Sequence, residues 1–257
     1  MTKFASRLLG AALAVTALSG CAVSSAGVEA TSVPASAVVD DGYLCMGVPV
    51  SLEALEERAP VSAIGEPGRT ALADAVWDDG KPIHISPEEG WYVVSMTDEH
   101  VAVMRDVAVV TDDFFGPVPP DHEILAVSWV ADATNVEPGW YVSKRSSCAL
   151  TVDLGALDVP EIQLQTPVEP STKELRLLVT EQNCNSGEDA QGRIEVISVE
   201  ESDGRVAVLL GVRPRGGAHN CPSNPATPFT ITLSEPVGTR EVVNAGLADP
   251  RVLALAE

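Results

Sequence analysis

The chain has 257 residues and carries 37 acidic against 16 basic side chains, which gives a formal net charge of −21 at pH 7. This charge argues against nucleic-acid binding, because such proteins draw their affinity from Lys and Arg side chains that neutralise phosphates. It also argues against a body that lies flat on an anionic bilayer, since like charges repel. We therefore expect a soluble folded body with an acidic surface.

The first twenty residues have the layout of an export signal. Lys3 and Arg7 form a short basic start, and an apolar stretch follows from Leu8 to Leu18. This stretch is shorter than the ~20 apolar residues that a membrane-spanning helix needs. A short basic head with a short apolar core is typical of a cleaved secretory signal. We expect residues 1–20 to be a signal peptide.

The signal ends with a motif for lipid attachment. Leu18-Ser19-Gly20-Cys21 resembles the lipobox of bacterial lipoproteins, in which the cysteine thiol receives a diacylglyceryl group and cleavage occurs just before it. The resemblance implies that Cys21 anchors the exported protein to the outer face of the cell membrane. Two acyl chains suffice for a stable anchor, because each buried CH₂ contributes ~0.8 kcal/mol. The alternatives are a soluble secreted protein and an uncleaved anchor helix.

Four cysteines remain besides Cys21, and they can pair in three ways. An oxidising exterior favours disulfides. We expect the pairs Cys45–Cys148 and Cys184–Cys221, because each pair then lies within one of the two domains that the sequence predicts. The rival interpretation is a zinc site, but zinc sites usually contain close Cys-x-x-Cys pairs, and the chain has none.

Composition and turn residues divide the mature chain into regions. Residues 21–39 are rich in Ser, Ala, Val and Thr without a persistent period, which predicts a flexible tether. Residues 40–157 are predicted to form a first β-rich domain with short helices. A linker stiffened by prolines over 158–171 leads to a second small β domain over 172–247, and 248–257 form a short, loosely held tail.

The first domain is predicted to begin with helices and to continue as hairpins. Ser51 can cap a helix over 52–58, and a second helix is expected over 70–77. Period-two patterns predict the strands that follow. These strands cover 91–96, 100–110, 124–130, 141–143 and 149–154, with a polar turn at 144–147 between the last two.

The second domain is predicted to consist of short strands separated by turns, over 175–179, 194–199, 206–212, 229–233 and 240–242. Such a pattern is typical of a small sandwich or an open barrel. The expected fold class is therefore mainly β, with one or two short helices in an α+β N-terminal domain and two small antiparallel β domains.

The second domain also resembles a C-terminal module of actinobacterial lipoproteins of unknown function. The matching residues are Cys184, Gly192-Arg193-Ile194, Cys221-Pro222 and Pro236-Val237-Gly238-Thr239-Arg240. The resemblance covers about the last third of the chain. It supports a β fold and the Cys184–Cys221 disulfide, and it implies no activity.

One internal echo is visible in the first domain. Glu88-Glu89-Gly90-Trp91-Tyr92-Val93 resembles Glu137-Pro138-Gly139-Trp140-Tyr141-Val142. We interpret the two copies as equivalent hairpins whose aromatic side chains pack on the core. The alternative is an aromatic platform for a sugar or a peptide, because Trp and Tyr are common on both kinds of surface.

Catalytic signatures are absent from the sequence, with no Gly-x-Ser-x-Gly, Ser-x-x-Lys or His-Glu-x-x-His pattern. Asp121-His122-Glu123 has residue types that suit a metal or acid–base site, but neighbouring side chains diverge, so we interpret it as an exposed loop. Asp112-Asp113-Phe114-Phe115 is interpreted as an acidic turn rather than a calcium or sugar site. We expect no metal and no cofactor.

The most distinctive polar segment is Arg213-Pro214-Arg215-Gly216-Gly217-Ala218-His219-Asn220-Cys221. A guanidinium suits carboxylates and phosphates because it donates in a planar fork. We hypothesise that Arg213, Arg215 and His219 contribute to a binding surface. The alternative is that these arginines pair with the protein's own acids.

The expected function is a non-enzymatic binding or interaction role in the cell envelope, with an envelope protein or a cell-wall component as the partner. The alternative is a cell-wall-directed hydrolase or accessory factor that uses acidic residues. The sequence does not single out such residues, because a glycosidase pair is defined by its separation across a cleft.

Overall fold

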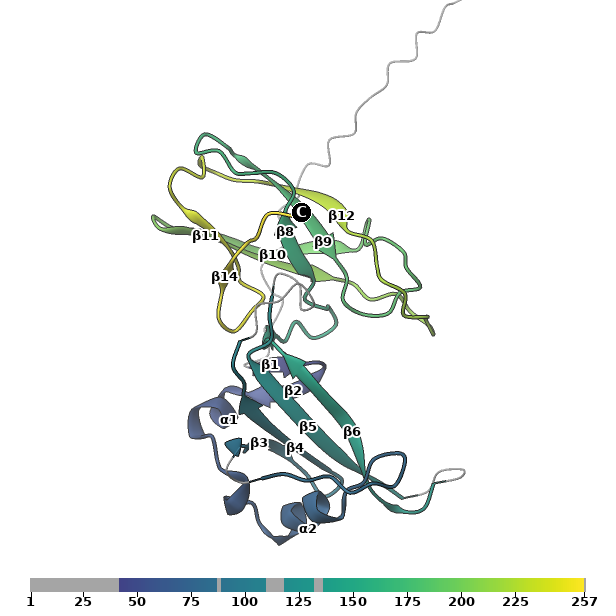
Figure 1. Ribbon diagram of the computed structural model, residues 1–257. Coiled ribbons are helices and arrows are strands. Elements are labelled where there is room, and N and C mark those ends of the chain that lie inside the picture. Colours follow the sequence, from purple (N-terminus) through teal and green to yellow (C-terminus); the bar gives the residue numbers. More distant parts are fainter. Residues whose placement is uncertain (1–41, 87–88, 110–117, 132–135, 257) are drawn as a thin grey trace, which may run out of the picture. The chain divides into compact units, whose positions relative to one another are not determined.

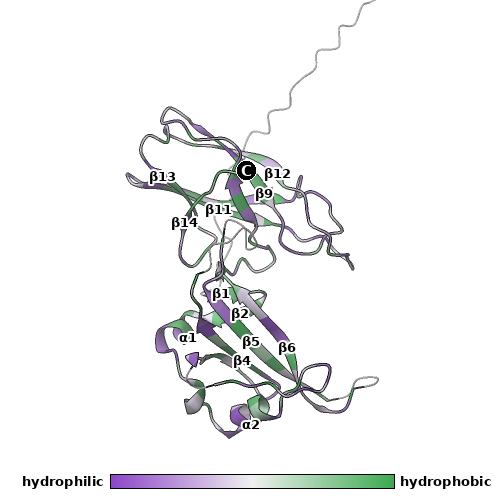
Figure 2. Ribbon diagram, viewed as in Figure 1, coloured by the Kyte–Doolittle hydropathy of each residue, from purple (hydrophilic) through white to green (hydrophobic). Residues whose placement is uncertain are grey.

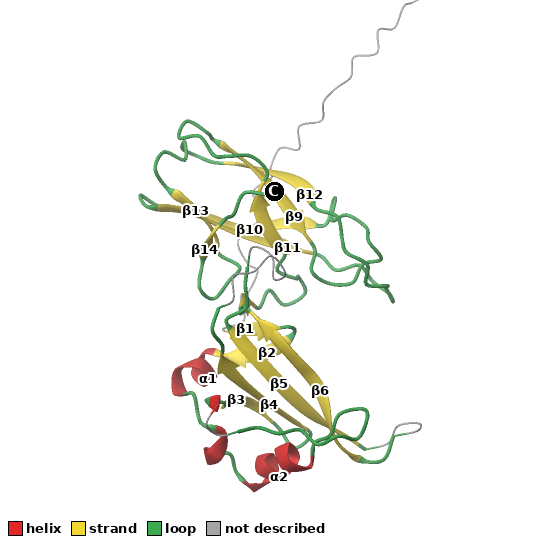
Figure 3. Cartoon of the chain, in the orientation of Figure 1, coloured by secondary structure: helices red, strands yellow, loops and turns green. Residues whose placement is uncertain are grey.

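The computed structural model describes residues 42–86, 89–109, 118–131 and 136–256. The predicted signal peptide, Cys21, the tether and the Asp112–Phe115 segment lie outside the described residues. Within the described part the fold is mainly β, as predicted, with helices α1 (Leu52–Glu57) and α2 (Glu66–Asp74) and several sheets that form no closed barrel (Figures 1 and 3). No described helix is long and apolar enough to cross a membrane.

The N-terminal region is built on a four-stranded antiparallel sheet. Its strands, in spatial order, are β3 (Tyr92–Met96), β4 (His100–Asp106), β5 (His122–Val130) and β6 (Gly139–Cys148). The predicted hairpin of the first two strands is confirmed. A smaller sheet contains β2 (Val48–Ser51), β1 (Gly42–Cys45) and β7 (Thr151–Val152) in that order.

Both faces of the central strands β4 and β5 are buried. Ile124 and Ala126 of β5 belong to a cluster that includes Val48 and Val50 of β2, whereas Leu125 and Val127 belong to a second cluster with residues of α2. A strand that is buried on both faces shows a continuous apolar run instead of alternation, and β5 shows this run from Ile124 to Val127.

The predicted turn at 144–147 is wrong, because β6 continues through it to Cys148. β6 lies at the edge of its sheet, and edge strands commonly carry charged side chains that prevent pairing with other chains. The Lys144-Arg145-Ser146-Ser147 segment therefore belongs to a strand and not to a loop. It forms a hydrophilic stretch of β6 (Figure 2).

The cap of the first helix is confirmed, since the backbone N–H of Ala54 donates to Oγ of Ser51 at 3.1 Å. The second helix lies about four residues earlier than the predicted start, because Pro67 is accommodated in its first turn. The chain leaves this helix before Val76, which exchanges backbone hydrogen bonds with Trp140 and Val142 of β6. Sheet hydrogen bonds thus replace the predicted last turn.

The C-terminal region is a sandwich of two sheets. One sheet contains β10 (Ile194–Glu201), β11 (Arg205–Val212), β13 (Glu241–Asn244) and β14 (Arg251–Val252), and the other contains β12 (Thr227–Thr232), β9 (Glu174–Thr180) and β8 (Glu161–Leu164). The five strands predicted here are present. β11 and β13 pair in parallel, whereas the other strand pairs of these sheets are antiparallel.

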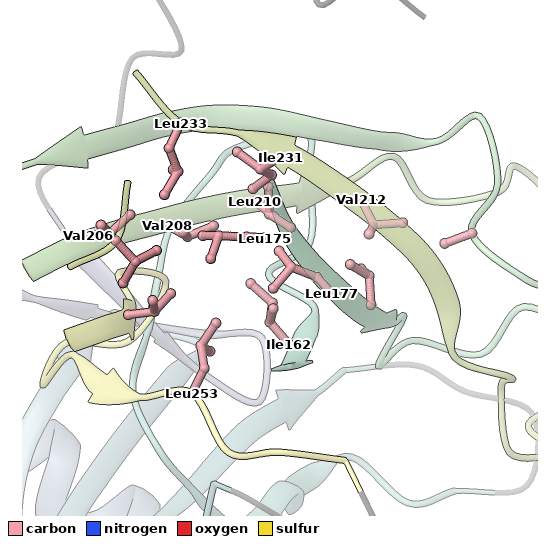
Figure 4. Close-up of a cluster of buried hydrophobic side chains, with 14 residues drawn as sticks. Ile162, Leu175, Leu177, Val206, Val208, Leu210, Val212, Ile231, Leu233 and Leu253 are labelled. Atoms are coloured by element: carbon pink, nitrogen blue, oxygen red, sulfur yellow. The ribbon is translucent and has the colours of Figure 1, made fainter. Parts of the chain in front are cut away.

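Alternate side chains of the two sheets meet in one core. Leu175 and Leu177 of β9 and Ile231 of β12 face Val208 and Leu210 of β11 (Figure 4). Each of these residues is almost completely buried. The opposite face of β9 carries Glu174 and Arg176, which are exposed, so this strand separates the core from a polar surface.

Two segments that were expected to be irregular belong to this sandwich. β8 lies within the predicted linker, and its Ile162 is buried in the core. The predicted tail contains β14 and the buried Leu253, so the expectation of a loosely held tail is wrong. Strands of two to four residues offer too few alternations to be recognised from the pattern alone.

Candidate functional site

Both predicted disulfides are present, and they differ in their surroundings. Cys45 and Cys148 join β1 to the end of β6 within a buried cluster, with Cα atoms 5.6 Å apart. Cys184 and Cys221 are both exposed, with Cα atoms 4.5 Å apart. The second disulfide ties an irregular segment, residues 213–224, to the chain that follows β9. We call residues 213–224 the Arg loop.

A buried ion pair lies beneath the Arg loop. The side chain of Glu181 is only 1% exposed, and both of its oxygens accept hydrogen bonds from Arg193, at 3.0 and 2.5 Å. The side-chain amide of Asn185 donates to the same carboxylate. Burial alone would raise the pKa of Glu181, but the hydrogen bonds from Arg193 and Asn185 outweigh it and hold this pKa below its ordinary value.

Several backbone contacts attach the Arg loop to this base. The side-chain amide of Asn224 donates to the carbonyl oxygens of Glu181 and Asn183, at 2.8 and 2.7 Å. The backbone N–H of Ser186 donates to the carbonyl oxygen of Asn220 at 3.0 Å. Together with the disulfide, these bonds hold in place a loop that has no regular secondary structure between Arg213 and Ala226.

The predicted site residues lie on the surface of this loop. A guanidinium nitrogen of Arg215 donates to the carbonyl oxygen of Asn185 at 3.0 Å, and His219 contacts Ser186 Oγ through Nδ1 at 3.2 Å. Arg215 and His219 are thus brought together over the segment that carries Cys184. Arg213 instead turns to β10, where it pairs with the carboxylate of Glu195.

The alternative that the arginines pair with the protein's own acids therefore holds for Arg213. Arg215 lies 3.9 Å from the carboxylate of Glu188, at the limit of an ion pair. The side chains of Arg213 and Arg215 remain 62% and 37% exposed. Both guanidiniums keep surface for a further acceptor, and charge-assisted hydrogen bonds to carboxylates or phosphates are the interactions that they form best.

A second polar cluster surrounds His122. The interpretation of Asp121-His122-Glu123 as an exposed loop is wrong, because His122 and Glu123 begin β5 and are half-buried. Nδ1 of His122 lies 2.5 Å from Asp121, and Nε2 lies 3.5 Å from Asp106, the last residue of β4. Asp106 also accepts a hydrogen bond from Arg58 at 2.5 Å. Glu123 points elsewhere, as expected for a neighbour. The register that sets Asp106 opposite His122 is the signal that would have revealed this cluster.

The cluster around His122 does not make a metal centre. Among the described residues no group of three or more His, Cys, Asp and Glu side chains is arranged to hold an ion. The carboxylate of Asp106 is instead paired with the guanidinium of Arg58.

The two copies of the aromatic echo occupy different environments. Trp91 and Tyr92 are buried, in agreement with the core-packing interpretation. Trp140 is half-buried at the edge of the sheet, where its ring meets that of Trp129 edge-on, with centroids 5.8 Å apart. Trp129 is exposed. Only the second copy therefore places aromatic surface near solvent.

Comparison with known proteins gives no relative from which a role could be transferred, because no family model, no curated protein and no solved structure matches the chain.

Proposed function

We propose that the protein is an exported lipoprotein that is anchored through Cys21 and binds an envelope partner through the Arg loop. The observation that carries this proposal is the placement of Arg213 and Arg215 on an exposed loop that is fixed by a disulfide and by contacts to a buried ion pair. The two disulfides are compatible with export, since such bonds persist in oxidising compartments.

The fixed loop favours a binding role. A loop that is ordered before it meets its partner loses little conformational freedom on binding. The exposed guanidiniums suit acceptors with two oxygens, such as carboxylates. The arginines would attract such a ligand only at short range, because exposed charges are screened beyond ~8 Å. At longer range the ligand would be repelled, since the chain as a whole carries a charge of −21. This favours a partner with a few carboxylates over a long polyanion.

Charge removal on the loop tests the binding role. We compare the wild type with an Arg213→Ala/Arg215→Ala variant by crosslinking in intact cells, followed by capture of the lipidated protein. The control is Arg205→Ala, which removes an exposed charge at the opposite end of β11. We expect partners captured by the wild type and the control to be lost from the double variant. Unchanged capture together with unchanged stability would contradict the proposal.

Substitution of the lipidated cysteine tests the anchor separately. We expect Cys21→Ala to release the protein from the membrane fraction or to block its maturation, because no thioether can form without the thiol. Cell fractionation and electrophoretic mobility report both effects. A variant that stays with the membrane at full length and with unchanged mobility would show that the lipoprotein assignment is wrong.

A further inference from the structure

A polar hollow lies on the C-terminal sandwich, away from the Arg loop. Its volume is about 440 Å³, and its lining includes Thr166, Thr172, Lys173, Glu174 and Arg176. Glu174 and Arg176 alternate along β9 with Leu175 and Leu177, which are buried in the core. The hollow therefore opens on the face of this strand that points away from the core. Its volume lies within the ~300–1,000 Å³ of small-molecule sites.

The hollow contains two basic side chains that form no ion pair with any described residue. Most Lys and Arg side chains of the described residues pair with a carboxylate. The ones without such a pair among the described residues are Lys144, Lys173, Arg176 and Arg205. Two of these, Lys173 and Arg176, line the same hollow. Acidic partners are abundant in a chain of charge −21, and half of the basic side chains without an ion pair among the described residues therefore lie in one hollow.

Most hydrogen-bond donors in the hollow have no acceptor among the described residues. The guanidinium of Arg176 makes no hydrogen bond to any described residue, and Nζ of Lys173 donates one, to the carbonyl oxygen of Ser234 at 2.8 Å. An ammonium group has three donors, so Lys173 retains two. The hydroxyls of Thr166 and Thr172 likewise have no partner among the residues that the structure describes.

The walls of the hollow are held by backbone hydrogen bonds. The N–H of Leu233 donates to the carbonyl oxygen of Lys173 at 2.7 Å, and the N–H of Gln165 donates to the carbonyl oxygen of Arg176 at 2.8 Å. On the other side, the N–H of Val237 donates to the carbonyl oxygen of Thr172 at 2.8 Å. The backbone that carries the binding groups is thus held in place on both sides of the hollow.

Glu174 decides the kind of ligand. It precedes Arg176 by two residues on the same face of β9, a spacing of ~7 Å along a strand. A carboxylate placed between Lys173 and Arg176 is attracted, and a cation beside Glu174 is attracted as well. A phosphate has no ammonium group to pair with Glu174, so it would leave the charge of Glu174 uncompensated. The lining is therefore complementary to a ligand whose carboxylate and ammonium groups lie about 7 Å apart or more, as the two ends of a short peptide do.

We propose that this hollow binds short peptides with free ends, with Arg176 and Lys173 holding the carboxylate and Glu174 holding the ammonium group. The threonine hydroxyls supply further hydrogen bonds to the peptide. This site is separate from the Arg loop, because the hollow lies at the start of β9 and the loop is attached to residues that follow its end. Each proposal can therefore fail without the other.

Isothermal titration calorimetry of the full-length protein in detergent tests the hollow. The probes are tri-alanine, its C-terminally amidated form, its N-acetylated form and inorganic phosphate. We expect tri-alanine to bind, and we expect amidation of the peptide or Arg176→Ala to weaken binding about tenfold or more, the effect of losing a charge-assisted hydrogen bond. N-acetylation and Glu174→Gln should also weaken binding, whereas Arg205→Ala, the matched control, should leave it unchanged.

Three results would overturn the proposal. The first is the absence of binding heat with millimolar tri-alanine. The second is an Arg176→Ala variant that binds as well as the wild type, with Arg213→Ala/Arg215→Ala measured alongside to show whether the peptide goes to the Arg loop instead. The third is phosphate binding with an affinity equal to that of the peptide, which would make the hollow a general anion site.

Discussion

Arg240 holds the carboxylate of Glu201 at the end of β10, with Nη1 of the guanidinium 3.0 Å from Oε2. Their side chains are only 9% and 17% exposed. The other oxygen of Glu201 accepts hydrogen bonds from the backbone N–H and the hydroxyl of Ser234, at 2.7 and 2.8 Å. One carboxylate thus links β10 to the segment that follows β12, and with it the two sheets of the sandwich.

This link makes the stability of the protein depend on pH. Burial alone would raise the pKa of Glu201, but the hydrogen bonds from Ser234, Arg240 and Glu235 outweigh it and lower the pKa from 4.5 to about 2. A carboxylate whose pKa is lower in the folded than in the unfolded state stabilises the fold at pH values above its unfolded-state pKa. This stabilisation is lost as the pH falls to the folded-state pKa. We expect a loss of about 3 kcal/mol between pH 4.5 and pH 2.

Urea denaturation at a series of pH values checks this expectation. Glu201→Gln should lower the free energy of unfolding at pH 7, because the amide cannot be ionised. It should also reduce the fall of this free energy between pH 4.5 and pH 2, which we call the acid limb. Glu200→Gln, a substitution at the exposed neighbouring position, is the control. Equal acid limbs in the wild type and in Glu201→Gln would show that the carboxylate of Glu201 does not contribute in this way.

The buried ion pair of Glu181 and Arg193 below the Arg loop predicts that a single substitution strongly lowers the free energy of unfolding. Glu181→Gln leaves the guanidinium of Arg193, which is 17% exposed, without its charged partner. Breaking a buried pair in this way costs ~3–5 kcal/mol. Thermal or urea unfolding measures the loss. The control is Glu66→Gln, which breaks an exposed pair with Arg69 and should cost less than ~1 kcal/mol. A similar small loss in both variants would contradict the structural role of Glu181.

The strands that the sequence predicts correctly are those with a regular apolar pattern. β9 and β11 carry alternate or continuous apolar residues over seven and eight positions, and this length is enough to define a period. β8 and β14 are shorter and lie beside Pro160 or Pro250, so local signals favoured a linker and a tail. The strand over 141–143 was predicted to end too early, because the polar residues that continue β6 to Cys148 are those of an edge, and position in the sheet is not visible in the sequence.

The candidate sites divide in the same way. The Arg loop could be found because its arginines, glycines and cysteine lie next to one another in the chain. Arg176 and Lys173 gave no signal, because the hollow that they line together with Glu174 is formed only in the folded chain. The contact of His122 with Asp106 depends on the register of β4 and β5, which period-two alternation alone leaves open.

Close packing at Gly246 predicts a position that does not tolerate a side chain. A Cβ atom there would lie 2.6 Å from Cγ1 of Val159 and 3.0 Å from Oδ1 of Asn244. Val159 is branched and cannot turn away easily, so we expect Gly246→Ala to destabilise the fold by ~1–3 kcal/mol. Gly204→Ala, where a Cβ atom would meet no atom within 4 Å, is the control in the same denaturation series. Equal stability of the two variants would refute the close contact.

The difference in exposure between the two disulfides predicts that they are reduced in order. Thiol–disulfide exchange needs an attacking thiolate to reach a sulfur atom. Cys184 and Cys221 are exposed, whereas Cys45 and Cys148 are buried and become accessible only when the N-terminal region opens. Under native conditions a dithiol reductant should therefore reduce Cys184–Cys221 first, with the reductant itself oxidised to a disulfide.

Alkylation followed by peptide mass spectrometry measures this order. At low dithiothreitol we expect label on Cys184 and Cys221 and none on Cys45 or Cys148. The loss of the exposed disulfide should cost roughly 4 kcal/mol, from the unfolded-chain entropy of its 37-residue separation. The Arg loop should then exchange its amide hydrogens faster, because the disulfide is one of the contacts that fix it. Simultaneous labelling of all four cysteines would instead mean that reduction follows global unfolding, and that the exposed disulfide gives no local control over the loop.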